Sequence, residues 1–305
     1  MKKIIPILLL LLASSAFAQQ DPLFSQYMFN KLALNPAYAG SREALSVDVL
    51  GRDQWEGIAG APKTLSASIH SPLRNPHIGL GANVYCDAIG NSVYSGALAT
   101  FAYRIIFPEG KLSFGIQAGY KHVYFDWSKM YLLNTEDQMF LGQESKKAVP
   151  DANFGIYYYT NRYFVGFSSK QLLQNQMAEV IVDGKSEFTK LLRHFYGMAG
   201  AAFPVADNIV FRPSILAKFV PNAPPQLDIN ASVLFANTFW IGASYRTEKA
   251  LSLMTEINLS QNIRLGYSYD VWFNELRSQN RGSHEIRLGF DFDVFQSRMH
   301  TPRYF

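Results

Sequence analysis

Apolar and polar residues alternate with a period of two through most of the chain, from about residue 43 onward. Residues 111–125 show the pattern most clearly. One side of this segment carries Leu112, Phe114, Ile116, Ala118 and Tyr120, and the other carries Ser113, Gly115, Gln117, Gly119 and Lys121. Residues 227–235, 263–271 and 285–294 alternate in the same way. Because successive side chains of a strand point to opposite faces of a sheet, the pattern predicts strands with one apolar and one polar face.

Two architectures bury one face of such strands. A sandwich packs the apolar faces into a core, whereas a membrane barrel turns them toward lipid and keeps a polar lumen. The alternating segments run to about 8–14 residues, which is longer than most sandwich strands. Charged residues make up only 17% of the chain and aromatic residues 14%, whereas about a quarter of an ordinary soluble chain is charged. The sequence therefore predicts an all-β fold, a transmembrane antiparallel β-barrel of the outer-membrane type.

About fourteen segments are expected to form strands, an even number that suits a single-chain bacterial barrel. Their ranges are 43–50, 63–71, 78–86, 92–106, 111–125, 151–159, 162–170, 193–203, 209–219, 226–235, 239–246, 250–259, 263–271 and 284–294. The longest connections, 51–62, 126–150, 171–192 and 272–283, all follow odd-numbered segments. Since outer-membrane barrels have short periplasmic turns and longer extracellular loops, this parity predicts that both termini are periplasmic.

Two residue types mark particular places along these strands. Aromatic residues lie near predicted strand ends, as in a girdle at the membrane interfaces. They are Trp127, Trp240, Trp272, Phe273 and several clusters of tyrosines. Pro213 falls inside a predicted strand. Because proline cannot donate a hydrogen bond to a β-ladder, it predicts a bulge or bend there.

The ends of the chain differ from the alternating part. Residues 1–18 place Lys2 and Lys3 before a short apolar run and end in Ala-Phe-Ala, which predicts a cleaved signal peptide and a mature chain beginning at Gln19. Residues 19–42 contain no regular period and are expected to form a periplasmic segment that plugs the barrel or docks a partner. Residues 43–294 are expected to form the barrel, and residues 295–305 a periplasmic tail. The predicted location is the outer membrane of a Gram-negative cell.

Residues with catalytic or metal-binding chemistry form no recognisable motif. The six histidines have no metal-ligand spacing, and there is no nucleophile elbow, phosphate loop or dinucleotide turn, so no enzyme activity, metal or cofactor is expected. Without Lys2 and Lys3 the 28 basic residues fall to 26 against 24 acidic ones, which gives no case for a nucleic-acid partner. A single cysteine excludes an intramolecular disulfide.

Charged residues on the predicted lumen face have both signs. They are Lys121, Arg212, Lys218, Asp228, Glu256, Arg264, Asp270, Glu285, Arg287, Asp291 and Asp293. The favoured interpretation is that opposite charges cross-link a filled lumen, and the alternative is a selective path for a ligand. Asp291 and Asp293 lie two residues apart on one face, which leaves a cation site as a minor alternative.

Two stretches near the start carry a more specific signature. The first is QDPLFSQYMFNKLALNPAYAGS, residues 20–41, and the second is RDQWEGIAGAPKTLSASIHSPL, residues 52–73. GLGANVYCDAIG, residues 79–90, and a terminal PRYF follow. Together they resemble the PorP/SprF family of the type IX secretion and gliding machinery of Bacteroidota. The resemblance spans the mature chain in order and is diffuse between about residues 126 and 280.

The residues that match the family pattern lie in these stretches. They are Asp21, Pro22, Phe24, Gln26, Tyr27, Asn35, Pro36, Gly40, Gln54, Trp55, Gly57, Gly60, Pro62, Asp87 and Gly90. The resemblance implies a non-catalytic outer-membrane barrel surrounded by outer-membrane lipid. Its implied partners are type IX secretion components, a large secreted adhesin, or both. Because no OmpA-like domain is appended, any attachment to peptidoglycan is expected to come from a separate peptidoglycan-binding lipoprotein.

Three functions remain open from the sequence. The leading one is a docking barrel, in which residues 20–41 plug the lumen or bind a partner and Gln54 and Trp55 lie in the first outer loop. The second is a transport barrel for a small or hydrophobic solute, with the N-terminal segment as a hatch. The third is a barrel enzyme with a catalytic site assembled across strands.

Overall fold

The computed structural model describes residues 21–126, 144–182 and 185–293. These residues form strands almost throughout. The strands are β1 (Leu45–Asp53), β2 (Lys63–Pro72), β3 (Ile78–Ile89), β4 (Ser92–Ile106), β5 (Lys111–Asp126), β6 (Glu144–Tyr159), β7 (Tyr163–Lys170), β8 (Gln176–Val182), β9 (Lys185–Lys190), β10 (His194–Ala201), β11 (Phe203–Ala206), β12 (Ile209–Phe219), β13 (Gln226–Phe235), β14 (Phe239–Arg246), β15 (Ala250–Asn258), β16 (Ile263–Trp272) and β17 (Ser283–Phe292). Short 3-10 helices are η1 (Lys31–Ala33), η2 (Pro36–Tyr38) and η4 (Glu275–Ser278). No helix in this part of the chain is long and apolar enough to span a membrane.

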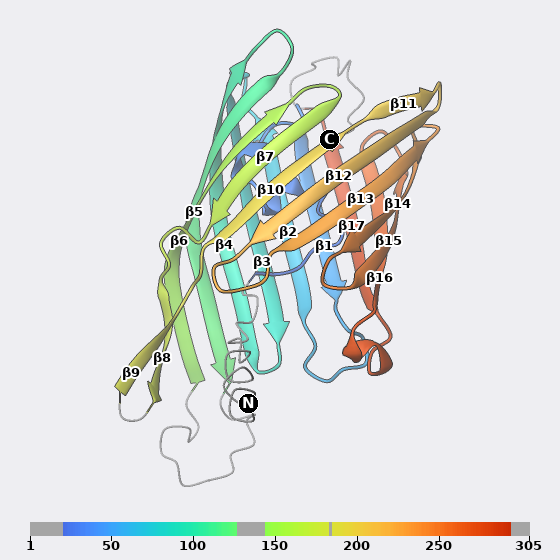
Figure 1. Cartoon of the computed structure of the whole chain (residues 1–305). Helices are drawn as coiled ribbons and strands as arrows, with labels where there is room; N and C mark the ends of the chain where they lie inside the picture. Colours follow the sequence, from blue (N-terminus) through green and yellow to red (C-terminus); the bar gives the residue numbers. More distant parts are fainter. Residues whose placement is uncertain (1–20, 127–143, 183–184, 294–305) are drawn as a thin grey trace, which may run out of the picture.

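The sheet closes on itself. Each barrel strand pairs antiparallel with its neighbours, and β1 pairs with β17 from Leu45↔Phe292 to Asp53↔His284. Strands β10 and β11 follow one another along the same edge of β12, so they occupy one position in the wall. The result is a closed antiparallel barrel of 14 strands (Figure 1). The predicted fold class and strand number are confirmed.

Three details differ from the sequence expectations. Strand β6 begins at Glu144 instead of 151 because β5 continues to Asp126 and offers a pairing edge along that length. Strands β8 and β9 form a separate two-stranded hairpin inside the predicted connection 171–192. Around Pro213 the pairing of β12 with β13 continues without a register shift. The interruption lies on the other edge of β12, between the pairs Gly200↔Ser214 and Phe203↔Phe211, because proline offers no N–H to that ladder.

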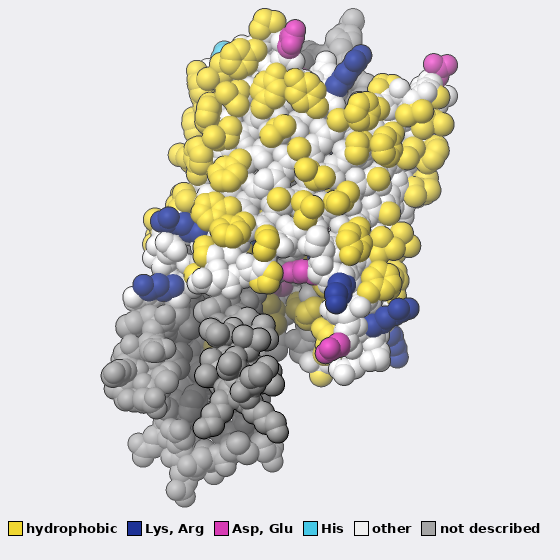
Figure 2. Space-filling model, in the orientation of Figure 1, with side chains coloured by type: hydrophobic (Ala, Val, Ile, Leu, Met, Phe, Trp, Pro, Cys, Tyr) yellow, Lys and Arg dark blue, Asp and Glu magenta, His cyan; other side chains and the backbone are white. Residues whose placement is uncertain are grey.

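The two faces of the barrel wall differ in polarity as the alternation predicts. In β5, Ile116 and Tyr120 are 59% and 66% exposed on the outside, while Ser113 and Gln117 are buried on the inside. Figure 2 shows the outcome on one side of the molecule, where apolar side chains cover the outer wall and charged side chains lie toward its ends. Such an outer face suits the hydrocarbon of a bilayer.

The predicted tryptophan girdle is wrong for two of its residues. Trp240 and Trp272 are only 5% and 4% exposed and lie on the inner face. Trp240 packs edge-on against Phe29, at 6.2 Å between ring centroids. Trp240 faces inward because Phe29 inside the barrel offers it a packing surface, and Trp272 packs against Trp55, which follows β1. Trp127 lies outside the described residues.

The longest connections between the described barrel strands lie at one of its two ends. The connection 54–62, the η4 connection 273–282 and the β8–β9 hairpin all lie at one end, called here the long-connection end (Figure 1). The other end, called here the short-turn end, carries the turns that follow β2, β4, β6, β11, β13 and β15. The assignment of these ends to the outside and the periplasm stays a prediction. The predicted signal peptide and the predicted C-terminal tail lie outside the described residues.

Candidate functional site

The barrel lumen is occupied by the chain's own N-terminal part, residues 21–44, called here the lumen segment (Figure 1). Every residue from Ser25 to Gly40 is buried. The segment enters beside Lys170, where β7 ends on the long-connection side, and reaches the short-turn end at Gly40, beside Pro72 and Gly79. It then continues into β1. The candidate functional site is therefore the interface between this segment and the inner wall.

The Glu285 carboxylate holds the segment near the long-connection end. Its two oxygens accept hydrogen bonds from the consecutive backbone N–H groups of Ser25 and Gln26, at 2.9 and 2.8 Å. Arg52 lies 3.2 Å from the same carboxylate and 2.6 Å from that of Asp270, and it donates to the Ser25 hydroxyl. The Ser25 hydroxyl donates in turn to Asp270 at 2.7 Å. Charge-assisted bonds in such a buried cluster are strong and directional.

Asp21 lies in a second charged cluster, between the end of β7 and the start of β10. Its carboxylate is 2.8 Å from the Lys170 ammonium and 3.1 Å from that of Lys121. It also accepts hydrogen bonds from the Gln171 amide and the Tyr196 hydroxyl. Only 6% of Asp21 is exposed. A buried carboxylate needs this number of donors to compensate for its lost hydration.

Phe29 lies in the middle of the lumen, between cationic and aromatic wall residues. The Arg212 guanidinium lies over its ring at 4.6 Å and over the Trp240 ring at 4.1 Å. Arg287 lies 5.4 Å from the Phe29 ring and donates to the Phe29 carbonyl at 3.2 Å. Arg287 also pairs with Asp48 and Glu256 on the wall. Cation–π contacts gain strength on desolvation, and Phe29, Arg212 and Trp240 are all buried.

Apolar side chains of the segment and the wall form one hydrophobic cluster inside the barrel. Its members include Tyr27, Met28, Phe29, Leu32, Leu34 and Tyr38 of the segment and Tyr157, Phe164, Tyr196, Met198, Leu234, Trp240 and Met254 of the wall. The segment and the inner wall thus share one packed core, and hydrophobic burial favours insertion of the segment into the barrel. This cluster explains why part of the inner wall departs from the polar pattern.

Asn35 and Pro36 begin the helix η2 and fix the segment to the wall. The Asn35 side-chain oxygen accepts from the Ala37 N–H at 2.9 Å, and Pro36 occupies the first helical position. Both are favoured at a helix start. The Asn35 amide nitrogen donates to the backbone carbonyls of Ile156 and Phe167, at 3.0 and 3.2 Å. These carbonyls belong to neighbouring strands β6 and β7, so one amide bridges two wall strands.

Glycines on the inner wall make room for the segment. A Cβ at Gly79, Gly115, Gly155 or Gly266 would come closer than 3.0 Å to an atom of the segment. At Gly115 the obstructing atoms are backbone atoms of Pro36 and Ala37, which cannot rotate away. The wall is therefore shaped to the backbone of the segment, beyond the side-chain contacts.

Replacing Gly115 with alanine should loosen the segment around η2. The added methyl group forces the Pro36–Ala37 backbone to move, at a cost of about 1–3 kcal/mol as for an overpacked core. Hydrogen exchange of the amides of residues 37–41 should become roughly tenfold faster or more. Gly51→Ala is the matched control, because no atom lies within 4 Å of a Cβ there. Equal exchange in the two variants would contradict a close fit.

The segment is also fixed at the short-turn end, where it joins β1. The Gly40 N–H donates to Nδ1 of His70 at 3.1 Å, and the Gly40 carbonyl accepts from Arg104. Gly40 has φ +73°, a conformation that favours glycine. Beyond it, Arg42 pairs with Asp291 at 2.8 Å. His70 thus serves as a hydrogen-bond acceptor for the backbone of the segment.

The remaining residues of the family pattern lie at the rim of the long-connection end. They are Gln54, Trp55, Gly57, Gly60 and Pro62 in the connection 54–62, called here the rim loop, with Asp87 and Gly90 on the adjacent hairpin. The Gln54 N–H donates to the Pro62 carbonyl, and the Gly90 N–H donates to the Gly60 carbonyl. Trp55 packs edge-on against Trp272 at 5.5 Å. The rim loop is thus held to its neighbours by backbone hydrogen bonds and by the packing of half-buried Trp55 on buried Trp272.

The structure separates the predicted site residues into two groups. Asp21, Gln26, Tyr27, Asn35 and Pro36 are buried in the lumen, and Pro22 and Phe24 are half-buried beside them, where the Phe24 carbonyl accepts from Arg246. Gln54, Trp55, Gly60 and Pro62 lie in the rim loop. The two groups meet through Arg52, which contacts Gln54 as well as the Ser25 hydroxyl.

Sequence reasoning missed several residues that hold the segment. Arg52 was expected in a loop, although the alternation of Asp48, Leu50 and Arg52 on one face continues to the end of β1. The β8–β9 hairpin also had a signal, because Asp183-Gly184 is a typical hairpin-turn dipeptide. The predicted cross-linking of lumen charges is confirmed by the ion pairs described above. The cation alternative for Asp291 and Asp293 is not supported: Asp291 contacts Arg42 and Arg264, and the described residues contain no cluster suited to a metal.

A closed barrel with an apolar outer belt and a charged interior defines an outer-membrane β-barrel protein. Comparison with known families agrees with this class. Residues 16–290 match the family described as type IX secretion system membrane protein PorP/SprF, and the chain belongs to that family. The family and the fold are those of a secretion-system barrel of the outer membrane and not those of an enzyme. A comparison with curated proteins gives no match.

Solved structures with a similar fold are also outer-membrane barrels. The toluene transporter TbuX of Ralstonia pickettii has 9% sequence identity and a TM-score of 0.50, covering 92% of this chain and 97% of that chain. The Acinetobacter baumannii outer membrane protein Omp33 has 8% identity and a TM-score of 0.46, covering 82% and 99%. At such identities the likeness concerns the fold alone.

Proposed function

We propose that this protein is a sealed, non-enzymatic docking component of the type IX secretion and gliding machinery. In this proposal the lumen segment is a permanent plug, and the protein acts through partners that bind its ends. The observation that carries the proposal is the filled lumen. The charged clusters at Glu285 and Asp21 and one hydrophobic cluster hold the segment, so the inside of the barrel is occupied by the chain itself.

The rim of the long-connection end supplies a rigid surface for a partner. Trp55 has φ +54° and its N–H donates to the Ser283 hydroxyl, to which the Trp272 indole also donates. The Glu56 N–H donates to the Gly282 carbonyl, which ties the rim loop to the connection 273–282. Phe273 is 47% exposed on this rim. An exposed aromatic residue on an ordered loop is a typical interface anchor.

The proposed partner at this rim is a secreted adhesin, whose export and surface attachment the barrel supports. The opposite end would face the periplasmic ring components and a peptidoglycan-binding lipoprotein. This arrangement rests on the predicted orientation, with long connections outside. The alternative role, transport of a small or hydrophobic solute, requires a path through the lumen, and the ion pairs and packing of residues 21–44 disfavour one.

Gentle extraction of the tagged protein from native outer membrane should recover type IX components or an adhesin. Phe273→Ala should reduce the recovered partner by about tenfold or more, since it removes an interface anchor. Phe292→Ala is the control, because Phe292 is 50% exposed at the short-turn end. Recovery of the unmodified barrel alone, even after crosslinking, would contradict docking. Loss of solute uptake on deletion, with adhesin export unchanged, would favour transport.

A further inference from the structure

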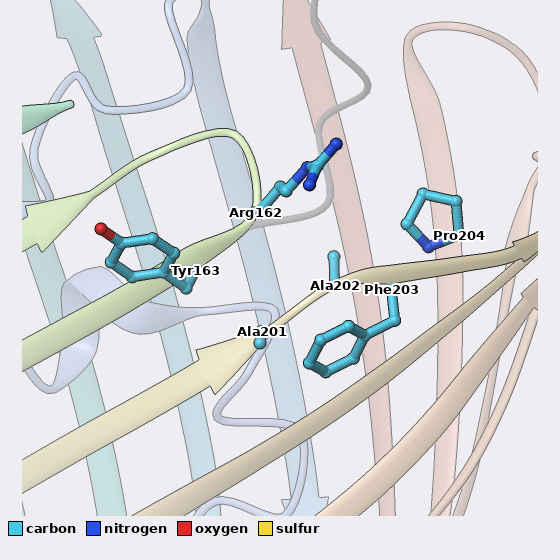
Figure 3. Close-up of a pocket in the computed structure, with 6 residues that line it drawn as sticks. All are labelled: Arg162, Tyr163, Ala201, Ala202, Phe203 and Pro204. Atoms are coloured by element: carbon cyan, nitrogen blue, oxygen red, sulfur yellow. The ribbon is translucent and has the colours of Figure 1, made fainter. Parts of the chain in front are cut away.

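A notch opens in the barrel wall at the short-turn end, between β7 and β11. It has a volume of about 530 Å³ and is lined by Arg162, Tyr163, Ala201, Ala202, Phe203 and Pro204. Figure 3 shows it between the turn that precedes β7 and the start of β11, with the Arg162 side chain reaching into the gap above Ala202 and Phe203. We call it the lateral notch. It borders the hydrophobic cluster of the lumen segment at Ala202, which belongs to both.

The lateral notch lies where the pairing of β7 with β10 ends and β11 continues with a partner strand on one side only. Strands β7 and β10 pair as far as Tyr163↔Ala201, and the Ala202 N–H then donates to the Arg162 carbonyl at 2.7 Å. Pro204 has no N–H to extend the ladder, and β11 continues along β12 alone. Opposite the break, Pro213 in β12 also lacks a donor. The wall therefore parts on one side of β11 and stays paired on the other.

The lateral notch is lined by apolar side chains of the outer belt and by one positively charged side chain, that of Arg162. Tyr163 and Phe203 are 45% and 53% exposed, and the neighbouring Val165 and Val205 are 54% and 68% exposed. Within the described residues no carboxylate forms an ion pair with Arg162. A guanidinium beside an aromatic surface at the edge of a bilayer matches an amphiphile with an anionic head and an apolar tail.

We propose that the lateral notch binds one glycerophospholipid. Its phosphate would accept bidentate hydrogen bonds from the Arg162 guanidinium, and one acyl chain would lie against Tyr163 and Phe203. Guanidinium groups match phosphate geometry, and basic pockets beside membrane segments bind lipid head groups. Short turns of outer-membrane barrels face the periplasm. With the predicted orientation of this barrel, the notch lies beside the periplasmic leaflet, which consists of phospholipid. A phospholipid is therefore a better occupant than lipid A.

Native mass spectrometry of the purified full-length protein tests the proposal. The detergent-extracted barrel is titrated with phosphatidylglycerol, and bound lipid is counted. Arg162→Ala should weaken retention of one phospholipid by about tenfold, and Arg162→Lys should weaken it less, because lysine keeps the charge but loses the planar fork. Arg74→Ala is the matched control, since Arg74 is exposed in another short turn and does not line the notch.

Three outcomes would overturn the proposal. The first is equal retention by Arg162→Ala and the unmodified protein. The second is equal loss in Arg74→Ala, which would indicate attraction by surface charge in general. The third is equal binding of uncharged diacylglycerol, or stronger binding of lipid A. Should Arg162→Ala fail to fold, Arg162→Lys together with the lipid series still decides between these results.

Discussion

Deleting residues 21–40 should convert a sealed barrel into a conducting pore. The unmodified protein should show almost no conductance in a planar bilayer, because its lumen is filled by packed side chains. Without the lumen segment, the inner wall leaves an aqueous channel lined by Arg52, Asp270, Glu285 and Arg287. Ionic conductance should rise by at least about tenfold, since a barrel with more than about eight strands needs additional atoms to fill its interior.

The deletion retains residues 1–20, so that the predicted signal and cleavage site are unchanged. The mobility of the protein in gel electrophoresis, compared with and without prior heating, checks that the shortened barrel still folds. Gly51→Ala serves as a control variant with the segment in place. A folded deletion variant that remains closed would show that other parts of the chain seal the lumen, and an open unmodified protein would contradict the plug itself.

Replacing Glu285 with alanine should release the start of the lumen segment while the rest stays in place. The change removes the acceptor of the Ser25 and Gln26 amides and leaves Arg52 with one carboxylate fewer. Breaking a buried ion pair in this way costs about 3–5 kcal/mol. Hydrogen exchange at these two amides should accelerate by about 10²–10³-fold. Amides around η2, which are held by Asn35 and the inner glycines, should change far less.

The pair Asp53–Lys63 offers a matched control at the same end of the barrel. Its atoms are 3.2 Å apart, and the two side chains are 40% and 69% exposed. Asp53→Asn should change the same exchange rates by no more than about fivefold, because exposed ion pairs contribute about 0–1 kcal/mol. If Glu285→Ala behaved like this control, the Glu285 carboxylate would not hold the segment.

Partner recovery with Glu285→Ala distinguishes a lumen segment that only seals the barrel from one that also takes part in docking. If the segment is only a plug, Glu285→Ala should alter exchange and conductance without changing partner recovery. If the segment also transmits a signal between the ends of the barrel, partner recovery should fall as well. The contact of Arg52 with both Ser25 and Gln54 is the one described route by which the lumen and the rim loop meet.

The barrel itself was predictable because strand alternation is a local pattern. A residue such as Ile116 or Ser113 takes its face from its position in the strand alone, and lipid outside imposes the same requirement on every strand. Connection lengths then separated the two ends. Strand bounds were predicted less accurately where the length of a strand is set by its neighbour. Strand β6, for example, begins at Glu144 because β5 extends to Asp126.

The site was predictable only in part. The family pattern marked Asp21, Gln26, Asn35 and Pro36, but it could not tell a plug from a docking segment. The direction of Trp240 was predicted wrongly, because its position near a strand end fits a girdle as well as a packed lumen. Only the filled lumen gives this side chain an apolar partner in Phe29 and a cation in Arg212.

The sequence by itself determined the class of fold, the number of strands and the residues of the family pattern, because each depends on short stretches of chain. The tertiary structure decided where the N-terminal segment lies and what holds it. Ser25 and Glu285 are 260 residues apart in the sequence. Ser25 and Asp270 are 245 residues apart. Closing the sheet brings them together, and only then do a carboxylate, an arginine and two backbone amides become one binding site.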